Sequence, residues 1–221
     1  MSINPRAQNS MEFKDLLEFE NIYLYAGDLP EENRENVPFI GLTLKPESEW
    51  WNEFHIKHDV TGAIDLPDNS VDIFQSEDVF EHIEYDQLKY TLNEIYRVLK
   101  PGGLFRLSMP DYRCDLLYER SKKDKHGNII FDKGGGGRYL RFKKKVVEGG
   151  HVWFPKYETT KSLLESTEFT DINFLHYYDT DGTPVLNEID YSKCFVRRTP
   201  DFDERVSSPL RPMSIVVDCS K

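Results

Sequence analysis

The sequence predicts an α/β protein built on a mostly parallel sheet with helices on both faces. One observation is that apolar runs of strand length alternate along the chain with segments whose apolar residues recur at helical spacing. Another is that a helical pattern over 85–100 ends abruptly at the sequence Lys-Pro-Gly-Gly and is followed at once by an apolar strand. A helix that stops so sharply before a strand is typical of a strand–helix–strand unit.

The individual elements follow from local patterns. Residues 11–20 carry apolar side chains at near-helical spacing and predict a short helix. A longer helix is predicted over 85–100, and a further one over 157–169, which Thr159 or Thr160 can cap. Strands are predicted at 21–27, 37–44, 54–60, 70–78, 104–110, 171–178 and 213–221.

The length of 221 residues predicts one domain over 11–221, preceded by a loose lead over 1–10. Two polar stretches, at about 112–156 and 179–212, are expected to be loop insertions. The first contains a hairpin-like sequence, KHGNIIF, and the run KGGGG, which is expected to add little packing or rigidity.

Composition limits the classes of partner. The net charge of −11 argues against a nucleic-acid-binding surface, which needs a basic face. The three cysteines lack the spacing of a zinc site or disulfide framework. Neither a signal peptide nor a membrane span is visible in the sequence. A cytoplasmic protein without nucleic-acid or membrane partners is therefore expected.

One stretch carries a specific family pattern. Residues 63–111 contain, in order, LPDNSVD, a strand, EHI, a helix and RVLKPGG before the next strand. This order resembles the second half of a class I S-adenosylmethionine-dependent methyltransferase of the small type 11-like kind. The resemblance implies a Rossmann-like sheet whose last strand is antiparallel, S-adenosylmethionine as cofactor, and a ligand site at the carboxyl ends of the strands.

The carboxyl-terminal part suggests a substrate class. The segment FVRRTPDFDERVSSPLRPMSIVVDC resembles a subgroup of these enzymes found beside glycosyltransferases in polysaccharide pathways. This resemblance implies methylation of a sugar hydroxyl in a glycan or nucleotide sugar, and a glycosyltransferase as a partner.

The resemblance also implies a set of cofactor-binding residues. In the family a glycine-rich loop follows the first strand, whereas YLYAGDLPEEN offers only Gly27. Thr43, or Glu47 further on, stands near the place of the usual ribose-binding acid. Asp59 is expected to accept a hydrogen bond from the adenine amino group, although a turn cap is the alternative. The full set of cofactor candidates is Tyr25, Ala26, Gly27, Asp28, Thr43, Asp59, Val60, Ser76 and Glu77.

Methyl transfer to a hydroxyl group requires removal of its proton, and histidine suits that task near neutral pH. His151, in a glycine-flanked loop, is the first candidate, and an ordinary surface histidine is the alternative. His82 is expected to be mainly structural, with a contact to substrate as a further role. Asp111 is expected to bind a substrate hydroxyl, to orient His151, or to cap the following helix.

Asp78, Arg113 and Trp153 are the expected substrate-binding residues, with turn capping as the alternative for Asp78. The sequence shows no cluster of metal ligands, so no metal is expected, although scattered acids such as Asp111 and Asp115 leave one open. Two other functions remain open: methylation of a different small molecule such as a quinone, and a binding module whose degenerate glycine loop no longer holds cofactor. An apolar pocket would favour a quinone-like acceptor, and a polar cleft would favour a sugar.

Overall fold

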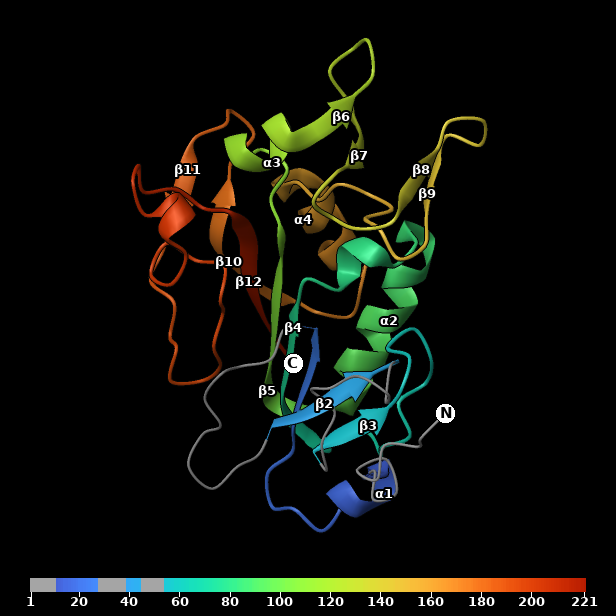
Figure 1. The fold of residues 1–221 in the computed structure, drawn as a ribbon. Helices are drawn as coiled ribbons and strands as arrows, with labels where there is room; N and C mark the ends of the chain where they lie inside the picture. Colours follow the sequence, from blue (N-terminus) through green and yellow to red (C-terminus); the bar gives the residue numbers. More distant parts are fainter. Residues whose placement is uncertain (1–10, 28–38, 45–53) are drawn as a thin grey trace.

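The computed structural model describes residues 11–27, 39–44 and 54–221. Its centre is a sheet with the strand order β11-β10-β12-β5-β4-β1-β2-β3 (Figure 1). The strands of this sheet are β1 (Tyr23–Gly27), β2 (Phe39–Thr43), β3 (His55–Lys57), β4 (Val71–Glu77), β5 (Leu99–Pro110), β10 (Asp171–Tyr178), β11 (Pro184–Leu186) and β12 (Ser214–Ser220).

The strand directions confirm the predicted sheet. Strand β1 pairs in parallel with β2 and β4, while β3 and β5 extend the parallel part on either side. Strand β12 runs antiparallel between β5 and β10. The short edge strand β11 pairs antiparallel with β10 and lies inside the stretch that the sequence assigns to a loop.

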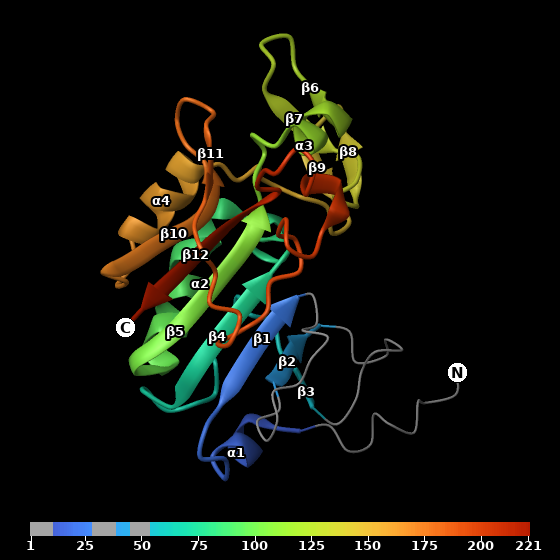
Figure 2. The same ribbon diagram turned by 90° about the vertical axis from the view of Figure 1, so that its left-hand side faces the viewer.

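Three helices share one large core with the sheet: α1 (Phe13–Leu16), α2 (Tyr85–Val98) and α4 (Tyr157–Glu165). The short helix α3 (Asp115–Arg120) belongs to a smaller core. Helix α2 lies behind β4 and β5 in the view of Figure 2. Its Leu88, Leu92 and Ile95 are fully buried in the same core as Phe74 and Phe105 of those strands. The 3.6-residue spacing that predicts this helix therefore marks its buried face.

The opposite face of β4 and β5 is covered by residues 190–198, which run in front of the strands in Figure 2. Polar side chains of the strands hold this segment. Gln75 donates to the carbonyl of Phe195 at 2.5 Å, and buried Arg106 donates to the carbonyl of Cys194 at 2.7 Å. Arg106 also forms two hydrogen bonds to Asp218 of β12, at 2.7 and 2.8 Å.

The stretch 112–156 is more structured than a loop. It holds α3, the antiparallel pair β6 (Ser121–Lys123) and β7 (Ile129–Asp132), and the pair β8 (Arg138–Leu140) and β9 (Lys145–Val147). The hairpin predicted from KHGNIIF is confirmed as β6–β7. This region projects beyond the carboxyl ends of β4 and β5, at the top of Figure 1.

The expectation that the glycine run adds no packing is wrong. A Cβ atom at Gly135 would lie 2.6 Å from Cγ of His151, so only a residue without a side chain fits against that ring. The glycines thus allow the chain to approach His151 closely.

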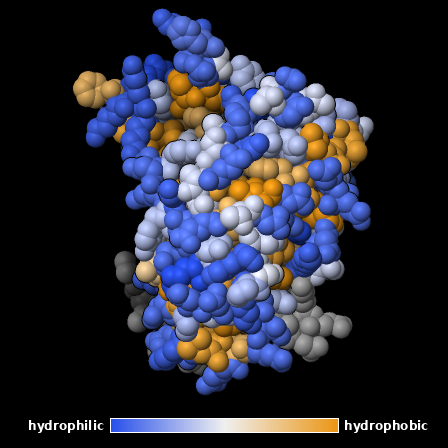
Figure 3. Space-filling model, turned by 180° about the vertical axis from the view of Figure 1, so that it is seen from behind, coloured by the Kyte–Doolittle hydropathy of each residue, from blue (hydrophilic) through white to orange (hydrophobic). Residues whose placement is uncertain are grey.

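The surface seen from behind is mostly hydrophilic, with separate hydrophobic patches near both ends (Figure 3). Among the described residues, no helix combines the length and apolar character needed to cross a bilayer. Cys114, Cys194 and Cys219 form no disulfide.

Candidate active site

A cavity of about 600 Å³ opens at the carboxyl ends of β1 and β2. Its wall is mixed, with apolar Leu42, Val60 and Val79 beside polar Thr43 and Asp59. Six of the predicted cofactor residues line it: Tyr25, Ala26, Gly27, Thr43, Asp59 and Val60. A ligand at this edge of an open parallel sheet is the general expectation for the fold.

Gly27 closes the tip of β1 tightly against β4. Its φ is +98°, and a Cβ atom would lie 1.8 Å from the carbonyl oxygen of Glu77. Glycine is therefore required at this position even though the following loop carries no further glycine. Beneath it, the buried hydroxyl of Tyr25 lies 2.9 Å from Nε2 of His55, and burial raises the pKa of Tyr25.

Asp59 lies on the cavity wall and also stabilises its own turn. Oδ1 of Asp59 accepts hydrogen bonds from the amide of Thr61 at 2.9 Å and from its hydroxyl at 2.7 Å. Asp59 therefore makes the turn-capping contact that the sequence offers as the alternative, and it also lines the cavity. Asp28 and Glu47 lie outside the described residues.

The structure does not place Ser76 and Glu77 on this wall. Ser76 is fully buried in β4, and Glu77 accepts the backbone amides of Arg197 and Arg198 at 3.0 and 3.1 Å. Glu77 is absent from the cavity wall because it lies on the same face of β4 as Gln75. Residues 190–198 cover that face. Glu77 therefore anchors the carboxyl-terminal segment.

A second group of polar residues gathers beside the cavity. The 3₁₀ turn η2 (Phe80–His82) carries Glu81 and His82, and the loop with His151 docks onto it. The amide of Val152 donates to the carbonyl of Glu81, and Nε1 of Trp153 donates to the carbonyl of Phe80, each at 2.8 Å. These two bonds fix the loop against the turn.

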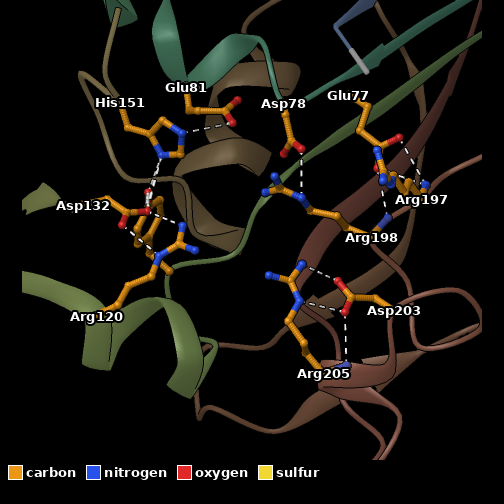
Figure 4. A network of polar contacts seen from close by, with 11 residues as sticks. Glu77, Asp78, Glu81, Arg120, Asp132, His151, Arg197, Arg198, Asp203 and Arg205 are labelled. Carbon is orange, nitrogen blue, oxygen red and sulfur yellow. Dashed lines mark hydrogen bonds and ion pairs between the residues drawn. The ribbon is translucent and has the colours of Figure 1, made fainter. Parts of the chain in front are cut away.

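Glu81, His82 and His151 form what we call the Glu81–His82–His151 cluster (Figure 4 labels the first and last). Nε2 of His151 lies 3.6 Å from Oε1 of Glu81, and the two imidazole rings lie 4.6 Å apart, edge to face. Because His82 also lines the cavity, the cluster adjoins the predicted cofactor site.

The other side of His151 is held by Tyr112 and Asp132. The Tyr112 hydroxyl donates to Oδ2 of Asp132 at 2.6 Å and contacts Nδ1 of His151. Arg120 donates to both oxygens of Asp132, at 2.8 and 2.5 Å (Figure 4). Burial raises the pKa of Asp132, but the bonds from Arg120 and Tyr112 outweigh it, so the pKa lies below its ordinary value.

These contacts select the tautomer of His151. The single hydroxyl proton of Tyr112 goes to the ionised Asp132, so its oxygen accepts a hydrogen bond from Nδ1–H of His151. The lone pair of His151 is then on Nε2, which faces Glu81. Burial, together with His82, lowers the pKa of His151 to about 3, so the ring is neutral at pH 7.

Asp111 has a different environment from the one that the sequence suggests. It is fully buried at the end of β5, where Oδ1 accepts the amide of Arg113 at 2.9 Å and Oδ2 accepts the amide of Tyr178 at 2.8 Å. Burial raises its pKa to about 6. Asp132, through Tyr112, orients His151, which is the role that the sequence offered for Asp111. Asp111 does not cap α3 either, because that helix begins only at Asp115.

The three expected substrate residues all have protein partners. Asp78, with φ of +56°, pairs with Arg198 at 3.0 Å, and Arg113 donates to Glu158 at 2.7 Å. Trp153 packs edge-on against Tyr85, with ring centroids 5.0 Å apart. It also borders a hollow of about 360 Å³ that contains several further aromatic side chains.

Sequence reasoning missed several residues of this region. Tyr112, Asp132 and Arg120 lie in a stretch without a family pattern, and the only nearby signal is the glycine run that follows Asp132. A polar hollow of about 410 Å³ was also missed; its lining includes Arg197, Arg198, Asp203 and Arg205 (Figure 4). The paired arginines of the FVRR sequence were the one local signal for it.

Comparison with known proteins agrees with this geometry. Residues 31–107 match the family described as "Methyltransferase domain". A crystal structure of a SAM-dependent methyltransferase from Archaeoglobus fulgidus superposes with a TM-score of 0.50 at 17% identity, covering 95% of this chain and 90% of that one. The fold is that of the S-adenosylmethionine-dependent methyltransferases.

A second methyltransferase structure, from Thermotoga maritima, is described as a possible histamine N-methyltransferase. It superposes with a TM-score of 0.50 at 15% identity, covering 98% of this chain and 87% of that one. In sequence, a probable S-adenosylmethionine-dependent methyltransferase of Mycolicibacterium smegmatis is 41% identical over 56 residues. That stretch is 25% of this chain and 21% of the relative.

These comparisons support a methyltransferase with S-adenosylmethionine as its cofactor. The family match contains Thr43, Asp59, Val60 and His82. It ends at residue 107, so Asp132 and His151 lie beyond it.

Proposed function

We propose that this chain binds S-adenosylmethionine and transfers its methyl group to a hydroxyl of a sugar, in a glycan or a nucleotide sugar. The observation that carries the proposal is the position of the Glu81–His82–His151 cluster, because His82 belongs both to the cluster and to the wall of the cofactor cavity. A hydroxyl acceptor needs polar groups at that junction.

The cavity fits the cofactor in size and character. Its volume of about 600 Å³ lies in the range of small-molecule sites. Asp59 would hold the adenine amino group, Thr43 the ribose, and the backbone at Ala26 and Gly27 the methionine part. When bound, the cofactor supplies a methyl group on a positively charged sulfur.

The transfer has a simple balance of bonds. The acceptor oxygen forms a bond to the methyl carbon while the carbon–sulfur bond breaks and leaves its electron pair on sulfur. The hydroxyl proton must leave, and Nε2 of His151, which lies 3.6 Å from Oε1 of Glu81 and carries the lone pair, would accept it. We therefore assign activation of the acceptor to the cluster and a structural role to Asp111.

The surroundings favour a polar acceptor over a quinone. Arg198, bonded to Asp78 at the end of β4, also lines the 410 Å³ hollow. Arg197 and Arg205 belong to the same wall, which also contains Asp203 and Glu204. Arg205 pairs with Asp203 at 2.6 Å, and the three arginines together suit a phosphate or an acidic sugar. On the other side, the hollow beside Trp153 offers aromatic surfaces of the kind that pack on sugar rings.

Calorimetric titration with S-adenosylmethionine and S-adenosylhomocysteine tests the cofactor step. We expect micromolar affinity, about −8 kcal/mol, and about 10- to 100-fold weaker binding for Asp59→Ala. Asp65→Ala, an exposed acid away from the cavity, is the matched control. If neither ligand binds, the chain is a binding module that has lost its cofactor.

A transfer assay with labelled cofactor then tests the acceptor. Nucleotide sugars, acidic and neutral oligosaccharides, and quinols are offered in parallel. Label on an oligosaccharide or a nucleotide sugar supports the proposal, whereas label on the quinols alone contradicts it.

A further inference from the structure

The Glu81–His82–His151 cluster has the composition of a metal site. One ligand atom from each residue lies within 4.8 Å of the others. Glu81 is fully buried and His151 is 6% exposed, whereas His82 is not buried, so the cluster reaches from the interior to the wall of the cavity. Two imidazoles and one carboxylate are the ligand set of catalytic zinc sites that keep one position open for water or substrate.

The orientation of His151 matches that of a metal-binding histidine. Such a ring usually donates its remote N–H to a carboxylate or another acceptor, which fixes the tautomer and directs the other nitrogen toward the ion. Here the acceptor is the hydroxyl of Tyr112, which is itself held by Asp132 and Arg120. Nε2 therefore presents its lone pair to the cluster.

The spacing within the cluster fits a shared ion better than a direct bond. Nε2 of His151 and Oε1 of Glu81 lie 3.6 Å apart, which is too long for a hydrogen bond. Two ligands about 2.0–2.1 Å from one zinc ion at the tetrahedral angle lie about 3.4 Å apart. The ligand atoms of all three residues lie within 4.8 Å of one another, so the side chains would have to move closer together to share one ion.

The nearby cations do not oppose a bound metal. Arg120 is paired with Asp132, and Arg198 is paired with Asp78 at 3.0 Å. Each arginine charge thus has a carboxylate beside it, and Glu81 adds a carboxyl group within the cluster itself.

We propose that Glu81, His82 and His151 bind one divalent transition-metal ion of the zinc or manganese type. This inference rests on the proposed function for its role: the ion would lie next to the cofactor cavity and lower the pKa of the acceptor hydroxyl as a Lewis acid. His151 then acts as a ligand, and the hydroxyl proton leaves to water.

The first experiment measures metal binding alone. Protein stripped with a chelator is titrated with Zn²⁺, Mn²⁺ and Mg²⁺ by calorimetry, and the visible absorption of bound Co²⁺ reports ligand geometry. We expect one transition-metal ion per chain and weak or no binding of Mg²⁺. His151→Ala and Glu81→Gln should each weaken binding by about 100-fold or more, since outer partners alone account for about 10- to 100-fold.

Matched variants separate this site from surface binding. His126→Ala and Glu119→Gln remove exposed side chains of the same types and should bind the ion as the unaltered chain does. Melting curves in chelator show whether each variant folds. Equal metal affinity in the unaltered chain and in folded His151→Ala overturns the proposal.

Transfer assays distinguish this inference from the proposed function. Chelator should lower the methylation rate and added Zn²⁺ or Mn²⁺ should restore it, with cofactor affinity unchanged. Full activity in chelator overturns the metal site but leaves the methyltransferase intact, with His151 as the base. Metal binding without cofactor binding overturns the methyltransferase and leaves the metal site.

Discussion

Gly135 packs directly against the imidazole ring of His151, so closely that a Cβ atom there would lie 2.6 Å from Cγ of the ring. Gly135→Ala should therefore displace His151 from the cluster. We expect the turnover rate to fall about 100-fold, as for other small displacements of reacting groups, with little change in cofactor affinity. Gly182→Ala strains a distant turn with φ of +81° and is the control for lost stability alone. Equal activity of the two variants would show that the position of His151 is unimportant.

Tyr112→Phe should disturb His151 without touching the cofactor cavity. The variant removes the oxygen that accepts Nδ1–H of His151 and donates to Asp132. The loss of such an orienting partner typically costs about 10- to 100-fold in activity or metal affinity. Steady-state kinetics and cofactor titration measure the two effects, with exposed Tyr90→Phe as control. A normal turnover rate in Tyr112→Phe would mean that the tautomer of His151 does not matter.

Arg198→Ala tests whether the acceptor is anionic. Arg198 lies between Asp78 and the polar hollow. For a phosphate-bearing or acidic acceptor, loss of one charged hydrogen bond should raise KM about tenfold or more, while cofactor affinity stays the same. The exposed Arg141→Ala controls for net charge. A neutral acceptor predicts equal KM values for both variants.

Arg106→Ala should destabilise the fold severely. The guanidinium is fully buried and joins β5 to Asp218 and to the carbonyls of Asp190 and Cys194. Removing one partner of a buried ion pair costs about 3–5 kcal/mol of unfolding free energy. Urea denaturation measures this loss of unfolding free energy. Arg138→Ala breaks a pair whose side chains are 63% and 60% exposed, and should leave the midpoint unchanged. A mild effect of Arg106→Ala would mean that residues 190–198 do not depend on this anchor.

Asp111 should make stability depend on pH. Burial raises its native pKa to about 6, above the ordinary value of 3.8, so the native state binds the proton more tightly. The resulting stabilisation is complete below about pH 4 and is lost as the pH rises through 6, a change on the order of 3 kcal/mol. From pH 4 to pH 7, the free energy of unfolding of the unaltered chain should therefore fall relative to that of Asp111→Asn. A constant stability difference for Asp111→Asn over this pH range would refute the assignment.

The sequence predicts β4, α2 and β5 well because their signals are local. Helical spacing gives α2, which ends at Val98, whereas Lys100-Pro101-Gly102-Gly103, expected to separate the helix from the strand, already lies inside β5. Six of the predicted cofactor residues line one cavity because they lie at or after strands whose carboxyl ends meet at one edge, and their role in binding stays a prediction.

The surroundings of His151 could not be predicted, because they depend on contacts between residues far apart in the chain. Tyr112, Asp132 and His151 meet although 39 positions separate the first from the last. No spacing rule connects them, and the glycine run that permits their contact resembles a linker when read alone. Glu77 belongs here too, since its carboxylate accepts the backbone amides of Arg197 and Arg198, which lie about 120 positions along the chain.

The pairing of β12 with β5 has a consequence for how the chain reaches this structure. The ladder joins Pro110 to Ser214 and Leu104 to Ser220, partners more than a hundred positions apart. Contacts of such long range slow folding, and until they form, β5 presents an open apolar edge that can pair with other chains. The end of β5 that carries Asp111 is therefore completed late, so refolding at low protein concentration should give the highest yield of active molecules.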